Sequence, residues 1–198
     1  KLMKTLRKTG IVLTALLCSV LMNAQTQWTP DKNHTKIGFT AIHYTITEVE
    51  GEFREFDASI TSDTEDFDGA KVTFTAKISS IDTNNERRDN HLKGDDFFNA
   101  EKYPEMKFDG NFNKIDGKYF LVGDLTIRDV TKPIKFDTKY SGTIALGEKG
   151  RKAGFKITGA IDRYDYGLKW DSVIETGGLV VERKIVITCN LELNEAKP

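Results

Sequence analysis

Apolar and polar residues alternate with period two over most of the chain after residue 34. In such a pattern every second side chain faces the same side of a strand, so the alternation predicts strands with one buried face. Turn signals separate these strands, among them Asp116-Gly117 as a two-residue hairpin turn. Eight segments show the pattern: 35–43, 53–60, 72–78, 106–112, 119–127, 134–140, 153–161 and 179–193.

Eight antiparallel strands joined mostly by short turns fit a barrel or a sandwich. We favour a closed eight-stranded barrel, because two long exposed edge strands would invite aggregation. Residues 44–50 are predicted to be irregular, and Phe53 is out of phase with Phe56, which predicts a bulge near residues 54 and 55. Neither an internal repeat nor a linker divides the chain, so the strands form one domain.

Two longer segments interrupt the alternation, at 81–104 and 162–178. In the first, Thr83 or Asn84 is a predicted N-cap for a short helix that runs through Leu92, with Glu86 closing a capping box. Gly94 is predicted to end this helix. The fold class is therefore all-β with one or two short helices.

The side chains on the predicted inner face are large and apolar, and small residues lie between them. An eight-stranded barrel is either filled by its own side chains or holds one small ligand. Interleaved small residues favour the second arrangement, although any single one of these residues could simply belong to the core. The large members are Phe39, Phe56, Phe74, Met106, Phe108, Phe112, Leu121, Phe136, Tyr140, Phe155, Ile157 and Ile187, and the small ones are Ala41, Ala76, Gly110, Gly123 and Gly159.

Charged residues are concentrated around Arg88, Asp89 and His91 in the first irregular segment. Arg88 and Asp89 are adjacent, so on one helix they point in different directions and cannot form a dyad alone. We interpret them as partners for backbone groups left open where strand pairing stops. The functional alternative is that they shape the mouth of a cavity and hold a ligand head group.

The first 24 residues have the pattern of a secretory signal peptide: a basic cluster, a 12-residue apolar run and Ala24 before a polar segment. The apolar run is shorter than the roughly 20 residues that a membrane-spanning helix needs, which argues against the alternative of a retained anchor. Removal of residues 1–24 leaves a domain of 198 − 24 = 174 residues, 25–198, with 25 basic and 30 acidic side chains and a net charge of −5. That balance argues against a nucleic-acid partner.

The chain contains no phosphate-binding loop, nucleophile elbow or paired-cysteine metal motif. Cys189 lies on the apolar face of the last predicted strand, where a buried structural thiol is expected. His43 shares the inner face of the first predicted strand, and we interpret it as a core histidine with a polar partner. We therefore predict no catalytic residue, no metal site and no cofactor.

A series of short motifs extends over nearly all of 25–198. They are, in order, Trp28 with Asp31, His34-Thr35-Lys36-Ile37-Gly38-Phe39 with His43, Gly51-Glu52-Phe53, Arg88-Asp89-Asn90-His91-Leu92, Asp96-Phe97-Phe98, Tyr103-Pro104, Gly123-Asp124-Leu125-Thr126-Ile127 with Thr131-Lys132-Pro133, and Asp162-Arg163-Tyr164-Asp165-Tyr166-Gly167-Leu168 followed by Glu175-Thr176-Gly177-Gly178. Together these motifs resemble the YceI family. The resemblance implies an extended lipocalin-like antiparallel barrel, exported to the periplasm, that holds a long isoprenoid or similar amphiphile. The chain departs from the family pattern at Asp162, where Asn is common, and at Glu182-Arg183, where the family has Gly-Asp.

These observations predict a periplasmic carrier that holds a polyisoprenoid, quinone-like or fatty-acyl molecule inside the barrel. The first alternative is an enzyme acting on such a lipid through His43 or His91 with Asp89, and the second is a barrel with a filled core. Exposed edge or mouth residues could also form a homodimer. The predicted ligand-binding residues are Phe39, Ala41, His43, Phe74, Ala76, Arg88, His91, Leu92, Phe97, Phe98, Phe108, Leu121, Phe136, Phe155 and Ile157.

Overall fold

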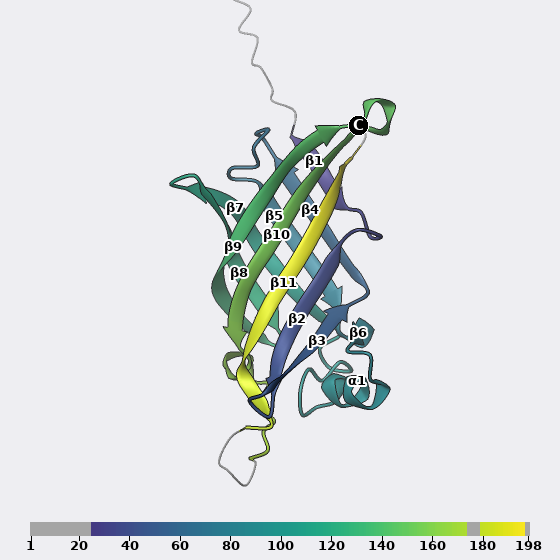
Figure 1. Ribbon diagram of the computed structural model, residues 1–198, viewed down its shortest axis with the longest axis vertical. Coiled ribbons are helices and arrows are strands. Elements are labelled where there is room, and N and C mark those ends of the chain that lie inside the picture. Colours follow the sequence, from purple (N-terminus) through teal and green to yellow (C-terminus); the bar gives the residue numbers. More distant parts are fainter. Residues whose placement is uncertain (1–24, 174–178, 197–198) are drawn as a thin grey trace, which may run out of the picture.

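The computed structural model describes residues 25–173 and 179–196, so the predicted signal peptide lies outside the described residues. The chain forms one antiparallel sheet that curls into a long barrel, with its strands steeply inclined across the view (Figure 1). The strands are β1 (Thr26–Pro30), β2 (Lys36–His43), β3 (Thr47–Phe53), β4 (Phe56–Ser62), β5 (Lys71–Lys77), β6 (Ile81–Asp82), β7 (Glu105–Ile115), β8 (Lys118–Ile127), β9 (Val130–Ala145), β10 (Arg151–Asp162) and β11 (Val181–Glu195).

These strands fill eight positions around the barrel, because three positions are each shared by two consecutive strands. β1 and β2 follow one another along the same edge of β11, with Trp28 opposite Glu195 and Ile37 opposite Cys189. β3 and β4 lie beside that pair, and β5 and β6 lie beside them in turn. β11 closes the barrel by pairing with both β10 and β1, which confirms the predicted closed lipocalin-like architecture.

The prediction of an irregular segment at 44–50 was wrong. β2 and β3 form a hairpin that turns at Tyr44 and Thr45, both at positive φ, and β3 begins at Thr47. Glu48 and Glu50 point outward in β3. Before Phe53 the inward positions hold only Thr47, Val49 and Gly51, which offer little apolar surface, so the alternation there is weak. β1 was also missed, since Trp28 is its one buried residue.

The predicted irregularity at residues 54 and 55 is a bend that separates β3 from β4. The backbone amides of Arg54 and Glu55 donate to the carbonyl and the hydroxyl of Ser80, at 3.1 and 2.9 Å. The bend shifts the phase of the ribbon, and therefore Phe53 and Phe56 are both buried on the inside.

One α-helix, α1 (Glu86–Lys93), lies in the described residues, beside the lower end of the barrel (Figure 1). Its N-cap is Asn85, whose side chain accepts a hydrogen bond from the Arg88 amide at 3.0 Å, so the predicted cap at Thr83 or Asn84 was wrong. Gly94 ends the helix as predicted. Short 3-10 turns occur at η1 (Ile78–Ser80), η2 (Gly147–Lys149) and η3 (Arg163–Tyr166).

Packed aromatic rings close the interior at the end of the barrel opposite α1. Phe67 comes from the acidic turn between β4 and β5, and its centroid lies 5.1 Å from Trp28 and 5.0 Å from Phe155. Phe155 stacks between Phe112 and Tyr140, at 4.7 and 4.9 Å. We call these five residues the aromatic plug.

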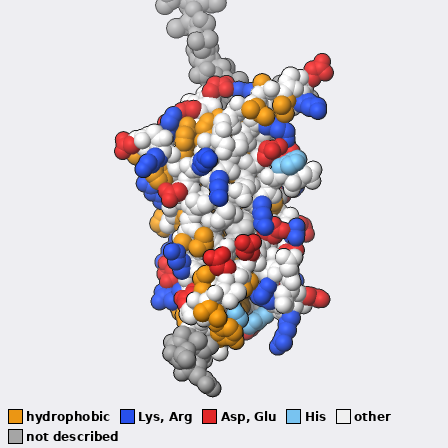
Figure 2. All heavy atoms as spheres, in the orientation of Figure 1, with side chains coloured by type: hydrophobic (Ala, Val, Ile, Leu, Met, Phe, Trp, Pro, Cys, Tyr) orange, Lys and Arg blue, Asp and Glu red, His pale blue; other side chains and the backbone are white. Residues whose placement is uncertain are grey.

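The outer face of the barrel carries Lys, Arg, Asp and Glu side chains interspersed with one another (Figure 2). Hydrophobic side chains gather near the lower end in the same view, and Tyr44, Ile46 and Val173 are among the exposed apolar residues of the chain. In the described part of the chain, every helix is too short or too polar to cross a membrane.

Candidate functional site

A long apolar cavity of about 190 Å³ runs inside the barrel below the aromatic plug. On β11 alone its wall extends from Val181 to Leu193, through Ile185, Ile187, Cys189 and Leu191. Twelve residue steps at about 3.3 Å each, tilted by about 40° from the barrel axis, correspond to about 30 Å along that axis. The cavity is therefore long and narrow, which suits a single extended chain.

Several inward-facing residues are only half-buried, because part of their surface lines this space. Ala58, Phe74 and Leu191 are examples, although each points to the inside of the sheet. Ten of the fifteen predicted ligand-binding residues lie in the wall: Phe39, Ala41, Phe74, Leu92, Phe97, Phe98, Phe108, Leu121, Phe136 and Ile157.

Three further predicted residues face inward or lie near the mouth but do not line the cavity. Phe155 belongs to the aromatic plug. Ala76 is 1% exposed and packs in the second hydrophobic cluster with Phe53 and Phe56. His43 ends β2, and its ring lies 4.0 Å from that of Tyr44.

Arg88 and His91 also lie outside the cavity wall, because other groups bind them. Arg88 donates from Nε to the Thr83 hydroxyl and from Nη2 to the Thr83 carbonyl, both at 2.7 Å. His91 Nε2 lies 2.9 Å from Asp96 Oδ2 at an exposed position. Asp89 also binds Thr83, so the residues of the proposed acid-base pair are engaged with separate partners.

The end of α1 and the segment after it supply the wall on one side of the cavity. Leu92, Phe97 and Phe98 line the space, and the Phe98 amide donates to the Leu92 carbonyl at 3.0 Å, which folds the segment back on itself. The Phe97 ring packs 5.1 Å from His91 and 5.4 Å from Trp170. His91 thus positions the lining residues without contacting the cavity itself.

Glycines in the barrel strands leave room for the rings of three phenylalanines that line the cavity. A Cβ atom on Gly159 would lie 2.1 Å from Cδ1 of Phe136, and one on Gly51 would lie 2.3 Å from Cζ of Phe39. The paired Gly110 and Gly123 would bring Cβ atoms within 2.6 and 2.8 Å of the Phe108 ring. These glycines keep the rings out of the interior, so they preserve the open space.

The prediction of site residues missed Arg163, the one charged residue in the described cavity wall. It is 3% exposed and lies in η3, at the lower end of the barrel. Its Nη1 donates to the carbonyls of Leu168 and Trp170, at 2.6 and 2.7 Å. The YceI-like motif at 162–168 contains this arginine, but the strand pattern alone did not place it inside the barrel.

The two departures from the family pattern compensate each other in the same region. Arg183 Nη2 forms an ion pair with Asp162 Oδ2, and Asp162 Oδ1 accepts from the Tyr164 amide at 2.9 Å. The hydrogen bond with Arg183 holds the pKa of Asp162 below its usual value against the effect of burial, which would raise that pKa. The ion pair therefore fixes the start of η3 to β11.

Cys189 is the free cysteine of the described residues and lies in the cavity wall on β11. Burial raises the pKa of its thiol to about 12. The thiol is therefore neutral near pH 7 and behaves as a small apolar wall residue, which is the role expected for it.

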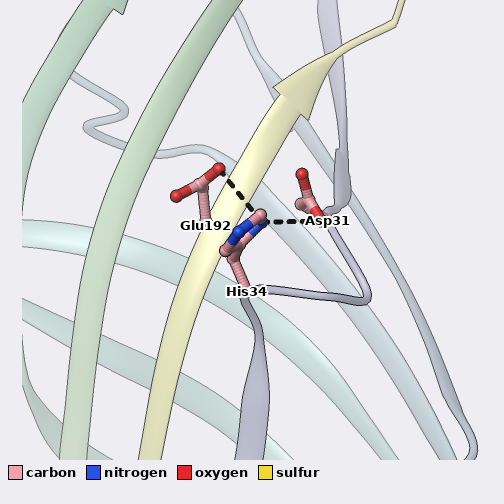
Figure 3. Close-up of side chains that lie close together, drawn as sticks. All are labelled: Asp31, His34 and Glu192. Atoms are coloured by element: carbon pink, nitrogen blue, oxygen red, sulfur yellow. Dashed lines mark ion pairs between the residues drawn. The ribbon is translucent and has the colours of Figure 1, made fainter.

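Asp31, His34 and Glu192 lie close together on the outside of the barrel, where the chain passes from β1 to β2 beside β11 (Figure 3). His34 Nδ1 lies 3.2 Å from Asp31 Oδ1 and 3.7 Å from Glu192 Oε1. The ammonium of Lys152 lies 2.7 Å from Asp31 Oδ2 and 2.5 Å from Glu192 Oε1. Because a cation of the protein already neutralises both carboxylates, the cluster acts as an ion-pair network that fastens the β1–β2 connection.

The comparisons with known proteins agree on one family. The YceI-like domain model matches residues 28–193. A UPF0312 protein of Staphylococcus aureus is 34% identical over 170 residues, which are 85% of this chain and 98% of that protein. The crystal structure of Campylobacter jejuni YCEI protein is 37% identical, with a TM-score of 0.68 over 84% of this chain and 96% of that one.

A more distant structure shares the fold. The polyisoprenoid binding domain from Saccharophagus degradans is 13% identical, with a TM-score of 0.60 over 85% of this chain and 98% of that one. At this level of identity the similarity extends to the lipocalin-like barrel alone.

Proposed function

The chain belongs to the YceI family, and from this membership and its long apolar cavity we propose that it binds one long, mostly apolar chain inside its barrel. The ligand is a polyisoprenoid, quinone-like or fatty-acyl amphiphile. The observation that carries the proposal is the cavity itself, which is about 190 Å³ in volume and is lined by side chains from strands all around the barrel.

The binding energy would come from removing the chain from water. Burial of each methylene contributes about 0.8 kcal/mol before the costs of ordering the ligand are subtracted. A long chain therefore binds without many polar contacts, and the almost wholly apolar wall matches this requirement. The polyisoprenoid-binding name of the Saccharophagus degradans domain supports the same class of ligand.

We further propose that the protein acts as a periplasmic carrier and not as an enzyme. The basic and apolar segments of residues 1–24 support export. Asp89, His91 and His43 lie outside the cavity wall, and each contacts a different residue. An enclosed lipid would therefore have neither of the predicted acid-base pairs beside it.

Mass spectrometry of an organic extract from the purified protein tests the proposal. We expect a long-chain amphiphile in stoichiometric amount, and displacement of a hydrophobic fluorophore by prenyl or acyl chains after the protein has been delipidated. Absence of any lipid from the extract, together with no displacement by either class of chain, would rule out the binding function.

A further inference from the structure

Among the described residues, Arg163 forms hydrogen bonds but no ion pair. All four of its hydrogen-bond acceptors are neutral backbone carbonyls: Nη1 binds Leu168 and Trp170, Nε binds Glu182 at 3.1 Å and Nη2 binds Val181 at 2.9 Å. A guanidinium has five N–H donors, so one N–H on Nη2 has no acceptor among the described residues.

The nearby carboxylates of the described residues are committed elsewhere. Asp162 forms its ion pair with Arg183, and Asp171 accepts a hydrogen bond from the Tyr164 hydroxyl at 2.8 Å. None of the carboxylates in 25–173 and 179–196 forms an ion pair with Arg163. Burial lowers the pKa of Arg163 below its ordinary value, and this effect outweighs the opposing influence of the nearby Tyr164, Asp171 and Asp162.

This guanidinium also forms part of the cavity wall. Arg163 lines the space together with Phe97, Leu168 and Val181, at the end opposite the aromatic plug. The rest of the described wall is uncharged. The four hydrogen bonds compensate the burial of this charge only in part, because carbonyls are neutral and one N–H has no acceptor among the described residues. An anion at this end of the cavity would supply the opposite charge and would therefore be favoured over a neutral group.

We propose that Arg163 is the head-group site of the cavity, and that the protein selects amphiphiles with an anionic head, a carboxylate or a phosphate ester. The inference rests on the proposed function and names the ligand class of the same cavity. The tail extends along β11 toward the aromatic plug, and the head accepts a charge-assisted hydrogen bond from Nη2 of Arg163.

Head-group selectivity of the delipidated protein tests the proposal. At pH 8 and low salt, four ligands with the same saturated chain compete with a hydrophobic fluorophore: a carboxylate, a phosphate monoester, an alcohol and an amine. We expect the two anions to bind at least about tenfold more tightly than the alcohol, and the amine to bind most weakly. Acetate and inorganic phosphate, which lack the chain, should not compete.

The outcomes distinguish the head-group site from the chain-binding function. Equal affinity for the carboxylate, the phosphate and the alcohol would overturn the head-group site but leave the chain-binding function intact. Failure of all four ligands to bind would instead overturn the function itself. Competition by acetate or inorganic phosphate would show an anion site independent of the chain, which also contradicts the proposal.

A pair of variants assigns the selectivity to one residue. Arg163→Gln should reduce the preference for the anions to about twofold or less while alcohol binding changes little. Lys184→Gln removes the same charge from the exposed side of β11, outside the cavity wall, and should leave the preference unchanged. A folded Arg163→Gln protein that keeps the full preference would overturn the assignment. If this variant does not fold, the ligand series on the unmodified protein still decides whether an anionic head is selected.

Discussion

Thr83 donates to the same carboxylate oxygen of Asp89 twice, from its backbone amide at 3.0 Å and from its hydroxyl at 2.6 Å. Thr83 is the first residue after β6, so its amide lies beyond the end of the strand pairing and needs another acceptor. Both residues are buried. The contact anchors the segment that carries Leu92, Phe97 and Phe98 into the cavity wall.

Replacement of Asp89 should therefore destabilise this segment. Asp89→Ala leaves two buried donors of Thr83 without an acceptor, which we expect to cost about 3 kcal/mol in the free energy of unfolding. Asp89→Asn keeps one acceptor oxygen and should cost less. Urea unfolding measures both, with Asp95→Ala, an exposed position on the same segment, as a control expected to change stability by less than about 0.5 kcal/mol. Equal stability of Asp89→Ala and the control would contradict this role.

A bulky side chain in the wall should block the ligand. Ala58 points into the cavity from β4, and we expect Ala58→Trp to weaken binding of a long-chain carboxylate or alcohol at least about tenfold while the barrel stays folded, because the indole occupies existing space. Ser59→Trp places the same ring on the opposite face of the strand and should not affect binding. Fluorophore displacement and circular dichroism measure the two effects. Unchanged affinity in Ala58→Trp would place the ligand elsewhere.

The close approach of phenylalanine rings to glycines predicts that one added methyl group reduces stability and binding. In Gly159→Ala the new Cβ would overlap Phe136, so the ring must move toward the interior. We expect a loss of about 1–3 kcal/mol in unfolding free energy and weaker chain binding. Gly154→Ala is the matched control on β10, since its Cβ would meet Ser141 at an ordinary 3.4 Å. The interpretation fails if both variants bind the chain as well as the unmodified protein.

Cys189 should resist alkylation in the folded protein. With a pKa of about 12, less than about one thiol in a thousand is ionised at pH 8, and the thiolate is the reactive form. We expect intact mass spectrometry to show almost no reaction with a maleimide at pH 8 until urea unfolds the protein, in a background where Cys18 is replaced by Ser. Lys156→Cys, at an exposed position on the neighbouring strand β10, is the positive control and should be labelled without urea. Rapid labelling of Cys189 under native conditions would contradict its burial.

The network around Lys152 predicts acid sensitivity. The hydrogen bond from Lys152 holds the pKa of Asp31 well below its usual range, so Asp31 stabilises the folded state above the unfolded-state pKa near 4, and this contribution is lost as the pH falls below it. Asp31→Asn should lower stability at pH 6 and should reduce the further loss between pH 6 and pH 3. Urea midpoints at the two pH values measure this. Asp57→Asn, at an exposed ion pair, should keep the dependence of the unmodified protein.

The strand pattern predicted the barrel because most strands place apolar side chains on one face over many residues. The prediction failed for strands in which this alternation is weak or covers few residues. β1 buries only Trp28, and β3 has Gly51 and Phe53 as its only buried residues, so neither alternates strongly. Seven of the ten predicted residues that line the cavity followed from the same alternation, and the other three, Leu92, Phe97 and Phe98, were predicted from the irregular segment 81–104.

Residues that enter the interior from loops could not be predicted in this way. Phe67 comes from an acidic turn and Arg163 from a 3-10 turn, and alternation does not state which loop residues fold back into a barrel. Because Arg88 and His91 are polar, we predicted that they bind a ligand at the mouth of the cavity. In the structure they instead contact Thr83 and Asp96 in the same segment. Only the tertiary arrangement separates a charge that holds a loop from one that faces a ligand.

The aromatic plug closes one end of the cavity and so limits the length of chain that the barrel can enclose. A chain that enters at the Arg163 end can advance only until its tail meets the packed rings of Phe67, Phe112 and Phe155. The distance between the plug and the lower end is about 30 Å along the barrel axis. In the proposed binding mode we therefore expect selection by length: a chain too short leaves part of the cavity wall uncovered, and one too long cannot place its head group at Arg163.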